Sequence, residues 1–482
     1  MSLFSQVEDP TDLDQVRSVI AASERPEALV PLGISRMVIS DDAAGEVVES
    51  LSVLLARAGR SVAGARVVAL MDTAVIRKGA VDLKSSVVEQ LAQVFQVDRV
   101  VLGDGGHLLA DDHALDAATA AFQGADGVVS IGSGTISDIA KVASDRAGGL
   151  PFVLVQTAAS VDGYTDNVSV ILRAGAKRTI PSRWPDVVLA DTEVIASAPQ
   201  ELNTSGFGEL LSLFTAPADW WLASQIGTDT SFHTTPRDLL LTFAGDPGEW
   251  GEGIGDGNPE AVKQLTRVLA IRGIGTGIAG STACLSGMEH LISHMLDMHA
   301  AAHHHEIGLH GEQVGVASVV GASAWEYLFV QLRAGRPVTP RTDGDHLQQI
   351  VLDVFAECDP SGALGAECWS DFSAKRAAWA GASANVEALI ADADALERNL
   401  GAMLPNALSL ATGLVRAGAT VSFDELDAWV TPQVWRWAVK NCLYMRNRVT
   451  IVDLLAELGW WTDADVAVVL GMTEAVIRQA RP

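Results

Sequence analysis

Residues 128–141 read V-V-S-I-G-S-G-T-I-S-D-I-A-K, and this stretch decides the fold. It opens with an apolar run rich in β-branched residues, passes through a turn with two glycines, and continues with the apolar spacing of a helix. A buried strand, a glycine turn and a helix in this order are typical of a Rossmann-like parallel sheet. The full G-x-G-x-x-G pattern is not matched, because Ser137 takes the third glycine position. Taken alone, the turn therefore also fits a plain tight turn.

Similar runs lie on both sides of this stretch. Strand-like apolar runs occur at residues 66–70, 99–102 and 152–155, and helix-like segments separate them. This alternation is typical of buried parallel strands joined by crossover helices. Residues 37–54 read as a strand that enters a helix. From about Thr192 onward strand-like runs disappear and long helical patterns dominate.

The predicted architecture therefore has two parts. An α/β N-terminal domain with a Rossmann-like parallel sheet spans residues 1–191, and an all-α domain spans residues 192–482. Residues 227–258 are rich in Gly, Pro, Asp and Thr, so we expect an inserted loop there with at most one short helix. A chain of 482 residues is long enough for two or three domains.

Charge and composition restrict the partners. A net charge of −27 disfavours nucleic acid and anionic membranes, because both reward basic surfaces. No stretch approaches the about 18 uninterrupted apolar residues of a membrane span, and the acidic N-terminal stretch lacks the apolar core of a signal peptide. We expect a cytoplasmic protein that acts on a small molecule, with no nucleic-acid or membrane partner.

Turn residues follow each predicted strand, and ligands of such sheets sit at these carboxyl ends. The turn at Gly132–Thr135 opens a helix, whose first N–H groups and positive dipole end suit a diphosphate. A second glycine turn ends the preceding strand, and two such turns favour a dinucleotide more than either alone. Asp72 can accept a ribose hydroxyl, although it fits a plain turn equally well. The candidate cofactor-binding residues at these ends are Asp72, Gly103, Gly105, Gly106, Gly132, Ser133, Gly134, Thr135 and Asp138.

Three residues of the helical part have the chemistry of a metal site. Glu209 lies in G-F-G-E, His290 in M-E-H-L-I-S-H and His310 in L-H-G-E. Three nitrogen and oxygen ligands with an open fourth position define a catalytic divalent site. His294 lies one helical turn after His290, so it can relay a proton or support a ligand. Spacing alone leaves open that these are ordinary surface or core groups.

Further histidines occur at His299 and at residues 303–305. Consecutive histidines point in different directions, as in a solvated loop. We assign this run no catalytic role.

Six motifs in this order resemble the sn-glycerol-1-phosphate dehydrogenases, a branch of the iron-containing alcohol dehydrogenase and dehydroquinate synthase superfamily. They are the run at residues 128–141, then T-A-A-S-V-D-G-Y, A-D-T-E-V-I, S-G-F-G-E-L-L, S-G-M-E-H-L-I-S-H and L-H-G-E-Q-V-G-V. The similarity extends from about residue 32 to residue 461. The resemblance implies two domains with the active site in the cleft between them, and a homodimer is expected.

The resemblance also implies a reaction: the NAD- or NADP-dependent reduction of dihydroxyacetone phosphate, or a close analogue, to sn-glycerol 1-phosphate. The cofactor would lie over the glycine turn, with Thr157 and Ser160 near the nicotinamide. Asp162 matches a family residue beside metal and substrate, and His290 and His310 match the metal histidines. The implied metal is one divalent ion, with zinc favoured and nickel or iron as alternatives.

Glu209 departs from the family pattern, because the dehydrogenases usually carry Asp there. Glutamate is the habit of dehydroquinate synthase and related sugar-phosphate cyclases, which form one alternative. The lysine that cyclases need after this motif is Ser212 here, and residues 161–170 contain no lysine, so the dehydrogenase interpretation stays ahead. A catalytically degenerate paralogue is the other alternative.

A second departure is Asp166, where an extra carboxylate is expected to repel a substrate phosphate. Gln156, in place of a common proline, is a further departure. Lys177 and Arg178 are candidate phosphate partners that also fit a solvated basic turn.

Overall fold

The computed structural model describes residues 4, 7, 9, 11–105, 108–173, 176–339 and 344–482. The chain divides into two compact units. The first comprises Met1–Gly206, Asp238–Phe243 and Glu252–Gly280, and the second Phe207–Arg237, Ala244–Gly251 and Ser281–Pro482.

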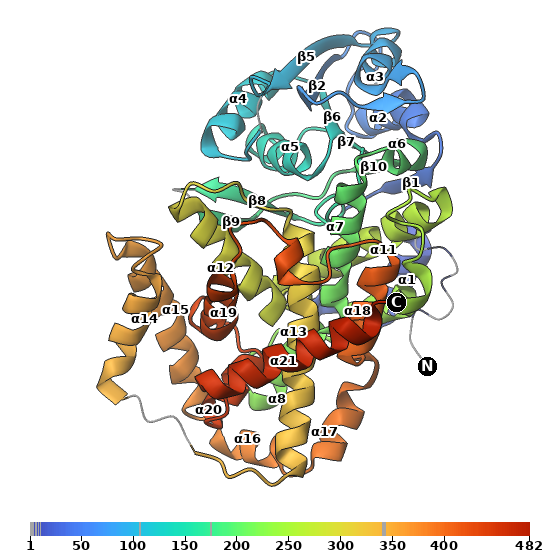
Figure 1. The fold of residues 1–482 in the computed structure, drawn as a ribbon. Helices are drawn as coiled ribbons and strands as arrows, with labels where there is room; N and C mark the ends of the chain where they lie inside the picture. Colours follow the sequence, from blue (N-terminus) through green and yellow to red (C-terminus); the bar gives the residue numbers. More distant parts are fainter. Residues whose placement is uncertain are drawn as a thin grey trace. The chain divides into compact units, whose positions relative to one another are not determined.

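A six-stranded parallel sheet lies at the centre of the first unit (Figure 1). The inner strands are apolar runs rich in β-branched residues and are buried on both faces, as a sheet covered on two sides requires. The predicted α/β domain with a parallel sheet is thereby confirmed. In spatial order the strands are β1 (Arg36–Ser40), β10 (Val187–Asp191), β7 (Phe152–Gln156), β6 (Gly127–Gly132), β2 (Arg66–Asp72) and β5 (Gln96–Leu102).

Two pairs of helices cover this sheet (Figure 1). The helices α2 (Val47–Arg57) and α3 (Leu83–Ala92) contact each other. They share a core with Val67, Ala69 and Met71, the residues of β2 that point to this face of the sheet. The helices α4 (Asp112–Phe122) and α5 (Gly134–Arg146) contact each other on the opposite face, toward which the alternate strand residues point.

Shorter elements complete the first unit. Two strands, β8 (Val168–Arg173) and β9 (Ala176–Pro181), pair antiparallel with each other, apart from the main sheet. The remaining elements are α1 (Leu13–Ala21), the short pair β3 (Arg77–Lys78) and β4 (Val81–Asp82), α6 (Thr192–Ala196), α11 (Pro259–Ala279), and the start of α7 (Gln200–Leu210).

The second unit is helical throughout its described residues, as predicted for the C-terminal part. Its central elements are α12 (Met288–Ala302) and α13 (His310–Arg333), which pack against each other and are joined by residues 303–309. Other helices are α8 (Ala216–Ile226), α14 (Leu347–Phe355), α15 (Ala363–Trp379), α16 (Ser383–Ile390), α17 (Ala393–Leu400), α18 (Ala407–Arg416), α19 (Pro432–Asn441), α20 (Ile451–Glu457) and α21 (Asp463–Ala480).

Residues 227–258 differ from the expected loop, because they contain two helices, α9 (Thr234–Ala244) and α10 (Pro247–Trp250). The Gly, Pro and Asp residues that suggested a loop serve as helix ends. Gly227 ends α8 with φ 91°, and Asp246 caps α10, where Pro247 takes the first position. Among the described residues, no helix has the length and apolarity to cross a membrane.

Candidate functional site

The predicted cofactor-binding turns lie together at the carboxyl edge of the parallel sheet. Asp72 is level with Leu102, so it neighbours the glycine turn that follows β5. Gly132 is level with Gln156, so the other glycine turn neighbours Thr157. The chain passes from β2 to β5 on one side and then crosses to β6 on the other side of β2. Such a topological switch point is where doubly wound sheets bind nucleotides.

The turn before α5 has the backbone of an anion site. Its N-cap, Ser133, makes no side-chain hydrogen bond to the helix, which leaves N–H groups of the first turn for another acceptor at the positive dipole end. A Cβ at Gly132 would lie 2.8 Å from the Cβ of Ile136, so the turn requires glycine there. Gly103 and Gly105 adopt φ of 85° and 99°, the left-handed region that favours glycine, and Gly106 lies outside the described residues.

The Asp72 carboxylate is held in place by Lys84, a buried lysine that the sequence did not single out. Its Nζ also donates to the carbonyl oxygens of Asp72 at 2.9 Å and Ala74 at 2.6 Å. This contact fixes the carboxylate at the switch point. It is compatible with both expected roles, ribose acceptor and turn residue.

Asp138 and Asp166 lie against the fully buried Lys141 of α5. The lysine Nζ is 2.6 Å from Asp166 Oδ1 and 3.5 Å from Asp138 Oδ1, and it donates to the carbonyl oxygen of Gly163 at 2.6 Å. Burial raises the pKa of both carboxyl groups, against the opposing effect of Lys141. The expectation that Asp166 repels a phosphate is therefore corrected, since its charge is buried and balanced by the lysine.

Asp162 is paired with Arg272 of α11, at 2.8 Å between Oδ2 and Nη1. Arg272 is 1% exposed, and the next residue, Gly273, lets α11 approach closely, since a Cβ there would lie 2.2 Å from Thr165 Oγ1. Sequence reasoning missed Arg272, although an arginine inside the apolar run L-A-I-R-G-I-G was a visible signal. Ser160 Oγ lies 3.3 Å from the hydroxyl of the buried Tyr164.

In the second unit the chain brings together Glu209, His290 and His310, whose ligand atoms lie within 4.8 Å of one another. Glu209 Oε1 is 3.3 Å from His290 Nε2, and Oε2 is 3.7 Å from His310 Nε2. Two ligands each about 2 Å from a tetrahedral zinc ion are separated by about 3.3 Å. The donor set and its spacing therefore fit a divalent metal.

Glycines set the spacing of this cluster. A Cβ at Gly208 would lie 2.2 Å from the carbonyl oxygen of Gly311, and one at Gly315 would lie 2.8 Å from Gly208 Cα. The backbones of α7 and α13 therefore touch where each carries its ligand. This close approach explains the second glycine of the G-F-G that precedes Glu209, whereas a Cβ at the first, Gly206, would lie 1.7 Å from the carbonyl oxygen of Ala159.

Two side chains orient the imidazoles. Glu289 accepts a hydrogen bond from His290 Nδ1 at 3.0 Å. Ser293 donates to Gln313 Oε1 at 2.7 Å, so its oxygen accepts from His310 Nδ1 at 2.9 Å. When they are neutral, both imidazoles thus keep their lone pair on Nε2, the atom that faces Glu209. Neither Glu289 nor Ser293 was predicted.

Electrostatics in this cluster favour a cation. Burial alone would lower the pKa of His290, but the carboxylates of Glu209 and Glu289 outweigh burial and raise the pKa to about 9. Glu289 is fully buried and accepts from Thr215 Oγ1 at 2.8 Å and from the Gly287 N–H at 2.6 Å.

His294 joins the same group, with its ring centroid 5.7 Å from that of His310 and 6.4 Å from that of His290. Ser212 stands where a sugar-phosphate cyclase carries a lysine. It is buried and donates to the carbonyl oxygen of Glu209 at 3.2 Å, so this position supplies no cation. Arg178 lies on β9, and the side chain of Lys177 is outside the described part of the chain.

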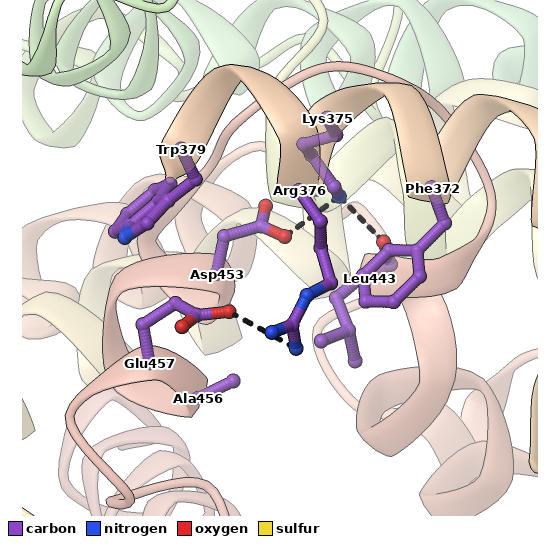
Figure 2. Close-up of a pocket in the computed structure, with 8 residues that line it drawn as sticks. All are labelled: Phe372, Lys375, Arg376, Trp379, Leu443, Asp453, Ala456 and Glu457. Carbon is purple, nitrogen blue, oxygen red and sulfur yellow. Dashed lines mark hydrogen bonds and ion pairs between the residues drawn. The ribbon is translucent and has the colours of Figure 1, made fainter. Parts of the chain in front are cut away.

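A separate pocket of the second unit contains none of the predicted site residues (Figure 2). Its charged groups pair with one another, Lys375 with Asp453 at 2.6 Å and Arg376 with Glu457 at 3.6 Å. Lys375 Nζ also donates to the carbonyl oxygen of Leu443 at 2.5 Å. These contacts tie α15 to α20 and identify a structural cluster.

Comparisons with known proteins agree with this arrangement. Residues 43–199 match the model of the family described as iron-containing alcohol dehydrogenase. Over 194 residues the chain is 38% identical to glycerol-1-phosphate dehydrogenase [NAD(P)+] of Pyrococcus furiosus. The aligned region covers 40% of this chain and 54% of that protein. The chain thus spans about half the length of the curated relatives it matches.

The fold likeness covers far more of the chain. Maleylacetate reductase from Agrobacterium tumefaciens superposes with a TM-score of 0.53 over 93% of this chain and 98% of that one, at 14% identity. An iron-containing alcohol dehydrogenase from Thermotoga maritima gives 0.50 over 92% and 98%, at 13% identity. The two-part fold of these dehydrogenases is therefore shown, including the part beyond the sequence match.

Proposed function

We propose that this chain, whose residues 43–199 belong to the iron-containing alcohol dehydrogenase family, reduces a small phosphorylated ketone with NADH or NADPH and one divalent metal ion. Dihydroxyacetone phosphate, giving sn-glycerol 1-phosphate, is the substrate we propose first. The cluster of Glu209, His290 and His310 carries this proposal, because it is an oriented donor set with two buried members and one half-buried member, and His294 lies beside it. The sequence likeness to glycerol-1-phosphate dehydrogenases supports the substrate class.

Each part of the chain has a distinct task in this reaction. The glycine turn at Gly132–Thr135 binds the cofactor diphosphate, and Thr157 and Ser160 contact its nicotinamide half. The dihydronicotinamide supplies the hydride. When bound to the three ligands, a divalent ion supplies Lewis-acid polarisation of the ketone oxygen.

The neighbouring side chains position and protonate. Glu289 and Ser293 hold the two metal imidazoles in the tautomer that presents Nε2. His294 delivers the proton to the substrate oxygen as general acid. Arg272 holds the Asp162 carboxylate at 2.8 Å, and we assign that carboxylate a substrate hydroxyl as its partner. Zinc is the metal we favour, nickel and iron being the alternatives.

One feature favours a cyclase instead, namely glutamate at position 209. The buried Ser212 opposes that alternative, because a cyclase needs a cation where this chain has a hydroxyl. A cyclase recycles its bound NAD, so the two reactions differ in whether cofactor is consumed.

The test uses the purified full chain with NADH or NADPH and dihydroxyacetone phosphate. We expect substrate-dependent oxidation of the cofactor that stops on chelation and returns with zinc. Glu209→Ala should remove both the metal and the activity, whereas Glu201→Ala, an exposed carboxylate of the same helix, should change neither. No turnover across a panel of phosphorylated and free ketones would sink the proposal. Light scattering tests the homodimer that we propose for the enzyme.

A further inference from the structure

The connection between α12 and α13 carries a second group of imidazoles, which the proposed reaction does not use. His299 lies in the last turn of α12, and His303 follows it by one helical turn. Their ring centroids are 4.2 Å apart, and the ring of His305 lies 6.3 Å and 6.1 Å from them. Three imidazoles thus gather within the seven residues from His299 to His305.

Two tryptophans support this group. The ring of Trp429 lies 5.6 Å from His299 and 5.5 Å from His305, with interplanar angles of 12° and 5°. Trp437 of α19 lies 5.9 Å from His299. The imidazoles therefore rest on an aromatic wall, while His303 and His305 are exposed to solvent.

The hydrogen bonding leaves nitrogen atoms available as ligands. His303 Nδ1 lies 2.9 Å from the carbonyl oxygen of His299, and a carbonyl oxygen only accepts. The proton is therefore on Nδ1, and the lone pair of His303 is on the exposed side of the ring, at Nε2. His299 Nδ1 is buried and has no hydrogen-bond partner.

The segment that carries the three imidazoles is acidic, whereas α19, which carries Trp437, has Arg436 and Lys440 paired with Asp463. Residues 273–332 contain no lysine or arginine, although they include Glu289, Asp297 and Glu306. Glu306 and Asp297 both act on Asp427, whose pKa burial and these two carboxylates raise. Burial and the neighbouring imidazoles lower the pKa of His299, so that its neutral, metal-binding form prevails at neutral pH.

We propose that His299, His303 and His305 form a second site for a divalent transition metal such as Zn²⁺ or Ni²⁺, separate from the Glu209 cluster. Imidazole is a ligand that these ions share, and histidines one helical turn apart are a common chelating pair. The lone pairs lie in the ring planes, so parallel rings do not converge on one ion. Binding therefore requires the exposed rings of His303 and His305 to rotate away from Trp429, with His299 as the anchor.

The first test counts bound ions on the full chain. Metal-stripped protein is dialysed against Zn²⁺, and we expect about two ions per chain. Glu209→Ala should remove one ion and His303→Gln with His305→Gln the other. Either single substitution should weaken the second site at least about tenfold, since even supporting groups of metal sites cost that much. His304→Asn is the matched control, because His304 takes part in none of the described ring contacts and its φ of 55° suits asparagine.

The outcomes separate the two sites. Wild-type protein that binds a single ion, lost in Glu209→Ala, would overturn the second site and leave the proposed function intact. Two ions that persist in the double histidine variant would overturn it as well. A single ion lost only in the histidine variants would support this site and contradict the Glu209 cluster.

The second test follows the ring stack itself. Ni²⁺ added to the Glu209→Ala chain should change the tryptophan fluorescence, because its binding unstacks the rings from Trp429. The change should be absent in the double histidine variant and reduced in Trp429→Phe. A change of equal size in the double histidine variant would contradict the proposal. Circular dichroism and thermal unfolding verify that each of these variants is folded.

Discussion

The two units each bury a cluster of acidic groups, and they neutralise it differently. In the first unit the carboxylates of Asp138 and Asp166 face Lys141, a permanent cation of the chain. In the second unit Glu209 and Glu289 face His290, an imidazole that carries charge only when protonated. The first cluster is complete as the chain folds. The second has the composition of a site whose charge is completed by an exchangeable cation, either a proton or a metal ion.

This difference has consequences for stability. Removal of one partner from a buried ion pair leaves an uncompensated charge and costs about 3–5 kcal/mol. A cluster completed by a metal is instead stabilised by mass action, by about 4 kcal/mol when the free ion is a thousandfold above its Kd. The stability of the first cluster should thus depend on its own side chains alone. The stability of the second should depend also on the metal concentration and the pH.

The largest expected effect is that of Lys141→Met. It leaves Asp166 and Asp138 buried without their cation, so the first unit should lose about 3–5 kcal/mol of unfolding free energy. Hydrogen exchange of the α5 amides in a urea series measures this loss. Arg146→Met on the same helix is the control: its pair with Asp116 at 3.3 Å is solvent-exposed and contributes about 1 kcal/mol at most. Equal losses of unfolding free energy in the two variants would show that the buried ion pairs of Lys141 contribute no more than the exposed pair of Arg146.

The second effect is the pH dependence of metal binding. In the metal-free chain the folded-state pKa of His290 is about 9, above the ordinary 6.5. Its ion pairs therefore stabilise the metal-free fold fully below pH 6.5, and this contribution is lost as the pH rises through about 9. A metal ion competes with that proton, so its apparent affinity should rise by up to about tenfold per pH unit over this window.

Calorimetry of Zn²⁺ binding in buffers of different ionisation enthalpy measures the released proton. The Glu209→Ala/His290→Ala chain, which lacks two of the three proposed ligands but keeps His299, His303 and His305, provides the baseline for subtraction. Binding that is independent of pH between 6.5 and 9 after that subtraction would contradict the interpretation of the second cluster.

The comparison also shows what the sequence could predict. The glycine turns, Glu209, His290 and His310 could be singled out because they stand in motifs that resemble a known family in order, whereas their spacing alone also fits ordinary turn, surface or core groups. Arg272 and Lys84 were not predicted: the arginine stands out within an apolar run, but the carboxylate that each residue meets is known only once the chain has folded. Residues 227–258 were read as a loop because helix caps and loops use the same residue types. Asp166 was misjudged for a similar reason, as its neutralising lysine lies 25 residues away.

The third effect tests the groups that support the ligands. Glu289→Gln keeps the size of the side chain and removes the negative charge behind His290, so the metal affinity should fall about 10- to 100-fold. Competition with a chromogenic chelator measures the change. Glu387→Gln, an exposed glutamate of α16, should leave the affinity unchanged. If the two variants bind equally well, Glu289 serves only to cap the start of α12.

The smallest effect is expected from Glu209→Asp, which restores the residue usual in the resembled dehydrogenases. The carboxylate oxygens now lie 3.3 Å and 3.7 Å from the two Nε2 atoms, and glycine contacts fix the backbones behind them. Removal of one methylene draws the carboxylate away from both imidazoles, and the touching helices cannot close the gap. The variant should therefore still bind Zn²⁺, with an affinity that is lower by about tenfold at most. Binding as tight as in the wild type, or tighter, would contradict the argument that the longer glutamate side chain is what brings the carboxylate within reach of both imidazoles.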